Sequence, residues 1–252
     1  MMLLKDRVAV VTGGTRGIGY AIVKKYLENG AKVVLFGSKE ESVNKAVESL
    51  KEENPDWVVE GMWPNLTDSE EMEQAIAKVG EKYGRLDILV NNAGMQVRGD
   101  AEEIELSRWD KLVELNITAV FELSQLAARQ MIPRGGGKII NVASMLSFFG
   151  GFRCSPYAAS KGAVAQLTKA CSNEWAGKGI NVNAIAPGYM DTPLNTTIIN
   201  DPERNREITL RIPAHRWGLP EDLKGTVIYL ASGAADYVSG AIIPIDGGYL
   251  GR

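Results

Sequence analysis

Short apolar segments alternate with longer amphipathic segments along almost the whole chain. The apolar segments are five to seven residues long and predict buried strands at 7–12, 32–36, 57–62, 86–91, 138–143, 180–186 and 241–245. The amphipathic segments predict helices at 17–29, from the second strand to Pro55, and at 68–83, 107–131, 157–175 and 220–230. Apolar strands that alternate with helices predict an α/β fold, in which a seven-stranded parallel sheet lies between helices as the middle of three layers.

The pattern has no linker, tandem repeat or low-complexity tract, so we expect residues 1–252 to form a single domain. One segment, 191–213, fits the alternation poorly, because it is polar and mixed and lies between a strand and a helix. Connections of this length in a compact domain are usually functional. We therefore predict a substrate lid over 191–213.

Composition and charge narrow the possible partners. The formal net charge of −3 and the lack of Lys/Arg runs argue against nucleic acid and against anionic membrane surfaces. Two separated cysteines, Cys154 and Cys171, and the single His215 predict no metal site. No apolar run is long enough to span a bilayer, and charged residues at 5–7 interrupt any signal-peptide core, so a cytoplasmic protein is expected.

A glycine-rich loop follows the first predicted strand and opens the first predicted helix. It reads Thr12-Gly13-Gly14-Thr15-Arg16-Gly17-Ile18-Gly19. Glycines allow the backbone to approach a pyrophosphate closely, and the helix N-terminus offers unpaired N–H groups. This context predicts a Rossmann-type dinucleotide site with contacts from Gly13, Thr15, Arg16, Gly17, Ile18 and Gly19.

The end of the second predicted strand indicates which dinucleotide is bound. It reads Phe36-Gly37-Ser38-Lys39, without the acidic residue that usually accepts hydrogen bonds from an NAD ribose. Arg16 and Lys39 carry charges that pair with a 2′-phosphate, and Ser38 can hydrogen-bond to it. NADP(H) is therefore favoured, and NAD(H) stays open if Glu40 or Glu41 reaches the ribose.

Tyr157 and Lys161 lie four residues apart at the start of a predicted helix, so their side chains share one face. Ser144 ends the predicted strand before them, at the sheet edge where ligands bind. Transfer of a hydride to or from a carbon–oxygen group also requires a proton donor or acceptor. A nearby ammonium can lower the pKa of a tyrosine, which is normally near 10, so we expect Lys161 to tune Tyr157 as general acid/base.

Together these motifs resemble the short-chain dehydrogenase/reductase family over essentially the whole chain. The resemblance implies that Asn116 kinks its helix and anchors a proton relay, joining Ser144, Tyr157 and Lys161 as catalytic residues. It also implies cofactor contacts beyond the glycine loop from the catalytic pair and from Asn92, Ala93, Gly94, Pro187, Gly188, Met190 and Thr192. Asn65-Leu66 stands where relatives usually have Asp and an aliphatic residue near the adenine, and an Asn there can still accept a hydrogen bond.

The second half resembles the sugar-acid dehydrogenases in particular, such as 2-deoxy-D-gluconate 3-dehydrogenase (also described as 2-dehydro-3-deoxy-D-gluconate 5-dehydrogenase) and gluconate 5-dehydrogenase. This resemblance is carried by residues 136–148, 181–190, 212–218 and 246–250. It implies a hydroxy or keto sugar acid as substrate. The candidate substrate contacts are Arg98 and Arg153, whose guanidinium groups pair with carboxylates, and Met145 and His215.

Two alternatives stay open. Phe36–Asn65 looks closer to hydroxysteroid relatives, and apolar Met145, Phe148, Phe149 and Phe152 would suit a hydroxysteroid dehydrogenase or a 3-oxoacyl-thioester reductase. A remoter alternative is a non-catalytic dinucleotide-binding regulator on the same fold. The family resemblance also implies a homotetramer or homodimer.

Overall fold

A seven-stranded parallel sheet forms the centre of the molecule. The computed structural model describes residues 2–251. The strand order is β3-β2-β1-β4-β5-β6-β7, and every pair of neighbouring strands is parallel. The strands are β1 (Val8–Thr12), β2 (Lys32–Phe36), β3 (Val59–Met62), β4 (Ile88–Asn91), β5 (Gly137–Val142), β6 (Ile180–Pro187) and β7 (Ile242–Ile245). The predicted three-layer α/β fold is confirmed.

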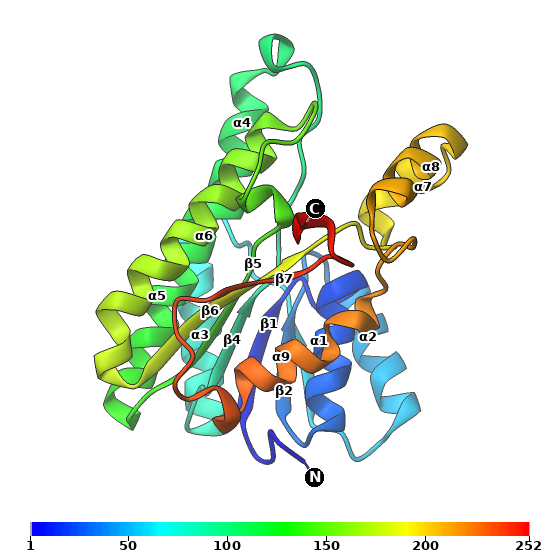
Figure 1. Ribbon diagram of the computed structural model, residues 1–252. Coiled ribbons are helices and arrows are strands. Elements are labelled where there is room, and N and C mark those ends of the chain that lie inside the picture. The colour runs from blue at the N-terminus through cyan, green and yellow to red at the C-terminus, as the bar shows by residue number, and fades with distance from the viewer. Residues whose placement is uncertain (1, 252) are drawn as a thin grey trace.

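Helices cover both faces of this sheet (Figure 1). One face carries α1 (Gly17–Glu28), α2 (Glu40–Glu53) and α9 (Lys224–Ala231), and the other carries α3 (Ser69–Tyr83), α5 (Ala119–Met131) and α6 (Ser155–Trp175). Successive side chains of a strand point to opposite faces. Accordingly, Ala9 and Val11 pack with the first set of helices, whereas Val8 and Val10 pack with the second. Both faces are therefore apolar, which explains the continuous apolar strands of the sequence.

The helices differ from the predictions mainly at their ends and in one interruption. The predicted helix 107–131 is α4 (Leu106–Val113), a π-helical turn (Glu114–Thr118) and α5. The helix predicted over 157–175 begins two residues earlier, at Ser155, because Pro156 suits a first turn, where no N–H donor is needed. A 3-10 turn, Pro220–Leu223, precedes α9.

The segment 191–213 is more ordered than its polar sequence indicates. It contains α7 (Thr196–Ile199) and α8 (Pro202–Arg211). The Asp201 side chain accepts hydrogen bonds from the N–H groups of Glu203 and Arg204, and this cap starts α8. These helices project beyond the carboxyl ends of the strands, near the C-terminal end of the chain (Figure 1).

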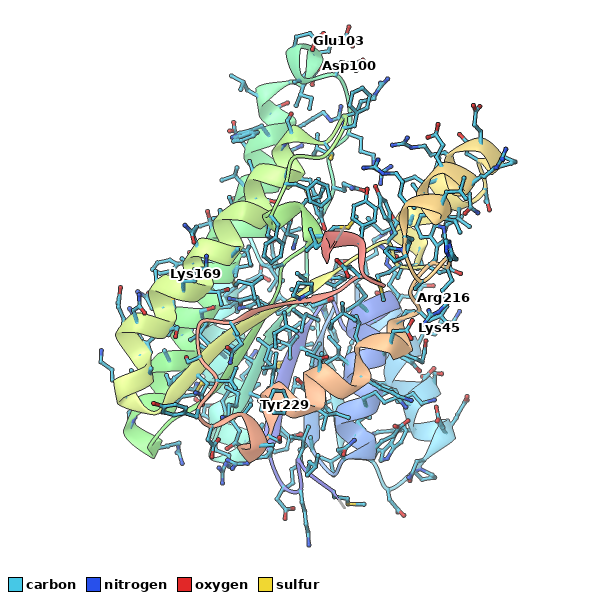
Figure 2. The ribbon with its side chains drawn as sticks, in the orientation of Figure 1. Lys45, Asp100, Glu103, Lys169, Arg216 and Tyr229 are labelled. Carbon is cyan, nitrogen blue, oxygen red and sulfur yellow. The ribbon has the colours of Figure 1, made fainter. Side chains whose placement is uncertain are left out.

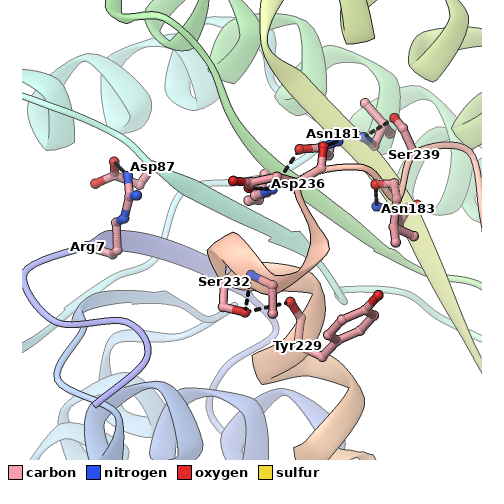
Figure 3. Close-up of polar contacts among 12 residues, drawn as sticks. Arg7, Asp87, Asn181, Asn183, Tyr229, Ser232, Asp236 and Ser239 are labelled. Atoms are coloured by element: carbon pink, nitrogen blue, oxygen red, sulfur yellow. Dashed lines mark hydrogen bonds and ion pairs between the residues drawn. The ribbon is translucent and has the colours of Figure 1, made fainter. Parts of the chain in front are cut away.

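Ion pairs hold the opposite edge of the sheet, where the strands begin. Asp87 is buried and accepts hydrogen bonds from Val8 N (2.9 Å), from Arg7 (3.0 Å) and from Arg85. Figure 3 shows Arg7 beside Asp87, and Asn181 beside Asp236. A cavity of about 640 Å³ lies at this edge, lined by Arg7, Asp87 and neighbouring loops, away from the residues expected to bind ligand. Among residues 2–251, no helix is long and apolar enough to cross a membrane.

Candidate active site

The candidate site lies at the carboxyl edge of the sheet, which β1, β4, β5 and β6 reach side by side. Parallel strands end at the same edge, so the segments that follow them meet there. These segments are the glycine loop, residues 92–98, residues 144–153 and residues 188–192. The predicted catalytic and cofactor residues are thus gathered from distant parts of the sequence.

The glycine loop packs too tightly for side chains at two positions. A Cβ at Gly19 would collide with the Gly13 carbonyl oxygen, and Gly13 itself has φ of +64°, which favours glycine. Helix α1 begins at Gly17, within the glycine-rich stretch, with no side-chain cap and no acidic residue in its first turn. Its N–H groups and positive dipole end therefore suit an anion such as a pyrophosphate.

Asn92 and Ala93 are tied to the glycine loop by Thr12. The Thr12 hydroxyl accepts hydrogen bonds from Asn92 N (3.0 Å) and Ala93 N (2.9 Å). The Asn92 amide donates to the carbonyl oxygens of Thr12 and Gly13, at 2.8 and 3.1 Å. Thr12 was not among the predicted site residues, although a hydroxyl at the last position of a buried strand was an available signal.

The segment after β6 reaches the start of α1. Thr192 lies next to Gly17, because a Cβ added to this glycine would be 3.8 Å from the Cβ of Thr192. Gly188 packs against Asp246, and a side chain there would meet the Asp246 backbone. Met190 is buried and forms an isolated bridge to Gly218. The structure therefore brings Thr192 to the glycine loop.

The residues expected to choose the dinucleotide surround the end of β2. A Cβ at Gly37 would contact the Thr15 side chain, so the glycine loop and the end of β2 are adjacent. Arg16, Ser38 and Lys39 are all exposed. Within residues 2–251 neither Arg16 nor Lys39 takes part in a salt bridge. Their charges are therefore available to an anion.

Asn65 and Leu66 lie beyond β3 and have different environments. The Asn65 Oδ1 accepts hydrogen bonds from the N–H and the hydroxyl of Thr67, at 3.1 and 2.8 Å, so it shapes the local turn. Leu66 is half-buried against the apolar core on the α3 side of the sheet. The backbone N–H of Asn65 donates to Glu71 Oε2 (2.7 Å), so the side-chain Nδ2 is the polar group of Asn65 without a hydrogen-bond partner among residues 2–251.

Tyr157, Ser144 and Lys161 converge in the middle of this edge. Ser144 follows β5, and its Oγ accepts a hydrogen bond from Leu146 N (3.1 Å). Lys161 is buried, and its Nζ donates to the Val142 carbonyl oxygen (2.6 Å) and lies 5.6 Å from the centre of the Tyr157 ring. The predicted (i, i+4) spacing on α6 therefore places both side chains against the end of β5.

Burial shifts the pKa values of this pair in opposite directions. Desolvation raises the pKa of Tyr157 to about 12, and a hydrogen bond with Ser144 offsets part of that rise. Desolvation also lowers the pKa of Lys161 to about 8. We expected Lys161 to lower the pKa of Tyr157, but among the chain's own residues burial has the largest effect, and the groups that lower this pKa are Ser144 and Arg98. Tyr157 is thus a protonated hydrogen-bond donor at neutral pH.

Asn116 lies in the π-helical turn between α4 and α5 and is almost fully buried. Its amide nitrogen donates to Met95 O (2.9 Å) and to Ser160 Oγ (3.1 Å), and its oxygen accepts from Met95 N (2.8 Å). π-Helical turns inside α-helices occur frequently at functional sites. The helix distortion expected at Asn116 is present, and it joins the residue to α6 and to the segment after β4.

A further hydroxyl, which the sequence analysis did not single out, connects Ser144 to α6. The Ser147 Oγ donates to the Lys161 carbonyl oxygen (2.6 Å) and accepts a hydrogen bond from Ser144 N (3.3 Å). This bridge fixes the turn that carries Ser144 relative to the helix that carries Tyr157. Short Ser/Thr turns are common, so the spacing alone held no distinct signal.

The four candidate substrate residues have different surroundings. Arg98 is exposed, and its charge lowers the pKa of Tyr157 and Cys154, so it lies near the catalytic tyrosine. Arg153 forms an ion pair with Asp100 (3.3 Å), which Figure 2 shows at the tip of the segment before α4. Met145 is buried in the turn after Ser144. His215 is exposed in a loop at φ of +52°.

An aromatic cluster adjoins these residues, and of its members only Phe149 was named from the sequence. The Tyr249 ring stacks on Phe149 at 5.8 Å and meets the Tyr189 ring edge-on at 5.7 Å. Trp217 meets the other side of Tyr189 at 5.4 Å. The cluster borders a cavity of about 790 Å³ lined by Phe148, Phe149, Arg211, Pro244, Tyr249 and Leu250. Only tertiary structure brings these four segments together, so no local spacing could reveal them.

Comparison with known proteins identifies the family. The model of the short chain dehydrogenase family matches residues 7–203. A 3alpha-hydroxysteroid dehydrogenase of Mediterraneibacter gnavus is 44% identical over 98% of both chains. A 2-dehydro-3-deoxy-D-gluconate 5-dehydrogenase of Pseudoalteromonas atlantica is also 44% identical, over 99% of this chain and 98% of its own.

The crystal structure of a gluconate 5-dehydrogenase from Burkholderia cenocepacia, in complex with NADP and tartrate, superimposes with a TM-score of 0.95 at 37% identity, covering 100% of this chain and 98% of that one. The family match spans most of the sequence, and the relatives match from end to end. The sheet order and the Ser144–Tyr157–Lys161 arrangement agree with it. The chain therefore belongs to the short-chain dehydrogenase family and is an oxidoreductase that acts on CH–OH groups.

Proposed function

We propose that this enzyme transfers a hydride between NADP(H) and a hydroxy or keto sugar acid. The observation that carries the proposal is the convergence of Tyr157, Ser144 and Lys161 at the same sheet edge that carries the glycine loop. Sugar-acid dehydrogenases are among the full-length relatives, and one related structure holds tartrate, a hydroxy dicarboxylate. Exposed arginine near Tyr157 suits such an acidic substrate.

The candidate residues would hold a dinucleotide across the carboxyl edge of the sheet. The glycine loop (13–19) would hold the pyrophosphate, Asn65 and Leu66 the adenine, and Thr192, with Met190, Pro187 and Gly188, the nicotinamide end. Asn92, Ala93 and Gly94 would line the middle of the path, and the catalytic pair would hold the nicotinamide ribose. Arg16, Ser38 and Lys39 would bind a 2′-phosphate, since the two cations have no ion-pair partner within residues 2–251.

When bound, the nicotinamide supplies or accepts the hydride. The protonated Tyr157 hydroxyl donates a proton to the carbonyl oxygen as a ketone is reduced, and takes it back in oxidation. Ser144 holds the same oxygen by a hydrogen bond. Lys161, when charged, stabilises the tyrosinate that forms, and Asn116 positions α6 through its bond to Ser160.

Initial rates with NADPH and with NADH test the proposal on keto sugar acids, a keto steroid and an acetoacetyl thioester. We expect turnover of a sugar acid, faster with NADPH. Tyr157→Phe should lower kcat by at least about 10²-fold and leave dinucleotide binding intact. Retained turnover would refute the role of Tyr157, and activity with NADH alone would refute the role of Arg16 and Lys39.

A second candidate, a hydroxysteroid dehydrogenase, is favoured by the aromatic cavity. Phe148, Phe149 and Leu250 offer an apolar wall that suits a flat steroid, and one relative at 44% identity is a 3alpha-hydroxysteroid dehydrogenase. Turnover of the keto steroid without turnover of any sugar acid would select this candidate.

We further propose a single domain with a lid over 191–213, a cytoplasmic location and a homotetramer. Exposed apolar side chains on α4 and α5, including Leu106 and Phe121, support an interface along these helices. Gel filtration should give about four times the 27.4 kDa of one chain, and a species of one chain would exclude the oligomer. Fractionation of the producing cells tests the location.

A further inference from the structure

The cavity beside the aromatic cluster has one charged side chain in its described lining, Arg211, among otherwise apolar or aromatic neighbours. Arg211 is the last residue of α8, inside the segment proposed as a lid. An apolar pocket with a single placed cation typically orients a ligand by one charged group. The position of Arg211 therefore indicates what the far end of the substrate carries.

The Tyr249 ring orients the Arg211 guanidinium. The guanidinium carbon lies 5.4 Å from the centre of that ring, which is itself stacked on Phe149. A guanidinium over an aromatic face is attracted to it and keeps its N–H donors at its rim. Arg211 thus combines a defined orientation with the donor geometry that matches a carboxylate.

Tyr189 connects this cavity to the catalytic residues. Its ring meets the Tyr249 ring edge-on at 5.7 Å, and the next residue in the chain, Met190, is buried and forms a bridge to Gly218. Phe149, on which Tyr249 stacks, lies in the same segment as Ser147, whose Oγ donates to the Lys161 carbonyl oxygen. The cavity therefore adjoins the reacting centre on the side of the proposed lid.

The two arginines singled out from the sequence are placed differently. Arg153 is paired with Asp100, and Arg98 donates through Nε to Gln96 Oε1 (2.9 Å). The Arg98 charge lowers the pKa of Tyr157, so a carboxylate at Arg98 would lie near the reacting oxygen. Arg211 instead reaches the site through Tyr189 and Tyr249, which suits a carboxylate several bonds from the reacting carbon.

We infer that Arg211 is a specificity-determining residue that binds the substrate carboxylate from the lid helix, while the Phe149–Tyr249 pair receives the C–H face of the same molecule. The inference rests on the proposed function in its substrate class. It makes α8 the element that recognises an acid, and it predicts that substrate binding draws the end of α8 and the C-terminal segment together.

The test compares Arg211→Gln with Arg206→Gln, which removes the same charge from an exposed position on the same helix. For a keto sugar acid, KM should rise at least about tenfold in Arg211→Gln, with kcat within about threefold of wild type. For the methyl ester of that acid, KM should not change, and Arg211→Lys should recover part of the loss. Calorimetric titration of tartrate into the NADP-bound enzyme should show binding lost in Arg211→Gln and kept in Arg206→Gln.

Equal effects of the two glutamine substitutions on KM and on tartrate binding would overturn the inference, as would an equal rise of KM for acid and ester. A wild type without turnover of any keto sugar acid would instead overturn the proposed function. In that case the tartrate titration, and the same acid-and-ester comparison on a keto steroid acid, decide the role of Arg211.

Discussion

The buried pair of Tyr157 and Lys161 shows what residue spacing can and cannot predict. The four-residue spacing correctly brings both side chains to one place, since it depends only on helix geometry. The ionisation of the pair depends on how much water the fold removes, and burial moves the two pKa values apart. No local pattern encodes that depth, so the direction of the Tyr157 shift could not be predicted from the sequence.

The buried charge of Lys161 is expected to lower the free energy of unfolding of the enzyme. Its pKa is lowered from 10.5 to about 8 in the folded chain, so the unfolded chain binds more protons between these values, and stability due to this group rises with pH across that window. Below pH 8 the side chain is charged in the folded chain, and the full destabilisation is present. Lys161→Met should therefore be inactive yet melt at an equal or higher temperature than wild type at pH 7.

Thermal unfolding checks this prediction, with Lys169→Met as control on the exposed side of the same helix (Figure 2). The difference in melting temperature between Lys161→Met and wild type should shrink as pH rises from 8 towards 10.5, and the control should show no such trend. A Lys161→Met variant that is clearly less stable at pH 7 would mean that the bond to Val142 O outweighs the burial of charge.

At the scale of elements, regular segments were predictable and irregular ones were not. Strands such as β1 and β6 follow from apolar runs, because burial on both faces requires them. Helix α8 was missed, since most of its residues are exposed and Ile208 is its one buried side chain. Its start nevertheless had a local signal, an Asp before a Pro, which is typical of a capped N-terminus.

Removal of the α8 cap should affect substrate binding more than overall stability. In Asp201→Ala the N–H groups of Glu203 and Arg204 lose their acceptor, at a cost of about 1 kcal/mol to α8. We expect KM for the substrate to rise a few-fold and the melting temperature to change little, because α8 contributes little to the core.

Asp68→Ala is the matched control, since Asp68 caps α3 in the same way, through the N–H groups of Glu70 and Glu71. Helix α3 packs against the sheet, so loss of the Asp68 cap should lower the melting temperature of the protein by roughly 2–4 °C and leave KM unchanged. Steady-state kinetics and calorimetry separate the two effects. A large stability loss in Asp201→Ala would show that α8 belongs to the cooperative core.

At the scale of the whole molecule, one edge of the sheet carries the residues of the reaction and the other carries ion pairs that stabilise the fold. The carboxyl edge gathers the reactive residues, and the amino edge carries the buried Asp87 with Arg7 and Arg85. The motifs at the carboxyl edge were predictable because each lies in one short stretch of sequence. The aromatic cluster was not, because Phe149, Tyr189 and Tyr249 come from separate loops.

Asp87→Asn should therefore lower stability without lowering activity. The substitution leaves two guanidinium groups without their shared carboxylate, and because both are half exposed we expect a loss of about 1–3 kcal/mol. Denaturant unfolding measures the loss, and kcat and KM should stay within about twofold of wild type. Asp236→Asn, whose exposed carboxylate pairs with Lys138, should change neither property.

The separation of the two edges also bears on how such enzymes diverge. The proposed substrate contacts lie on loops and helix ends beyond the strands, so they can be exchanged while strand pairing and the Asp87 ion pairs stay as they are. The chain shares the same 44% identity with a hydroxysteroid dehydrogenase and with a sugar-acid dehydrogenase. A change of substrate class therefore requires substitutions only at the carboxyl edge, where they leave the interactions that stabilise the sheet unchanged.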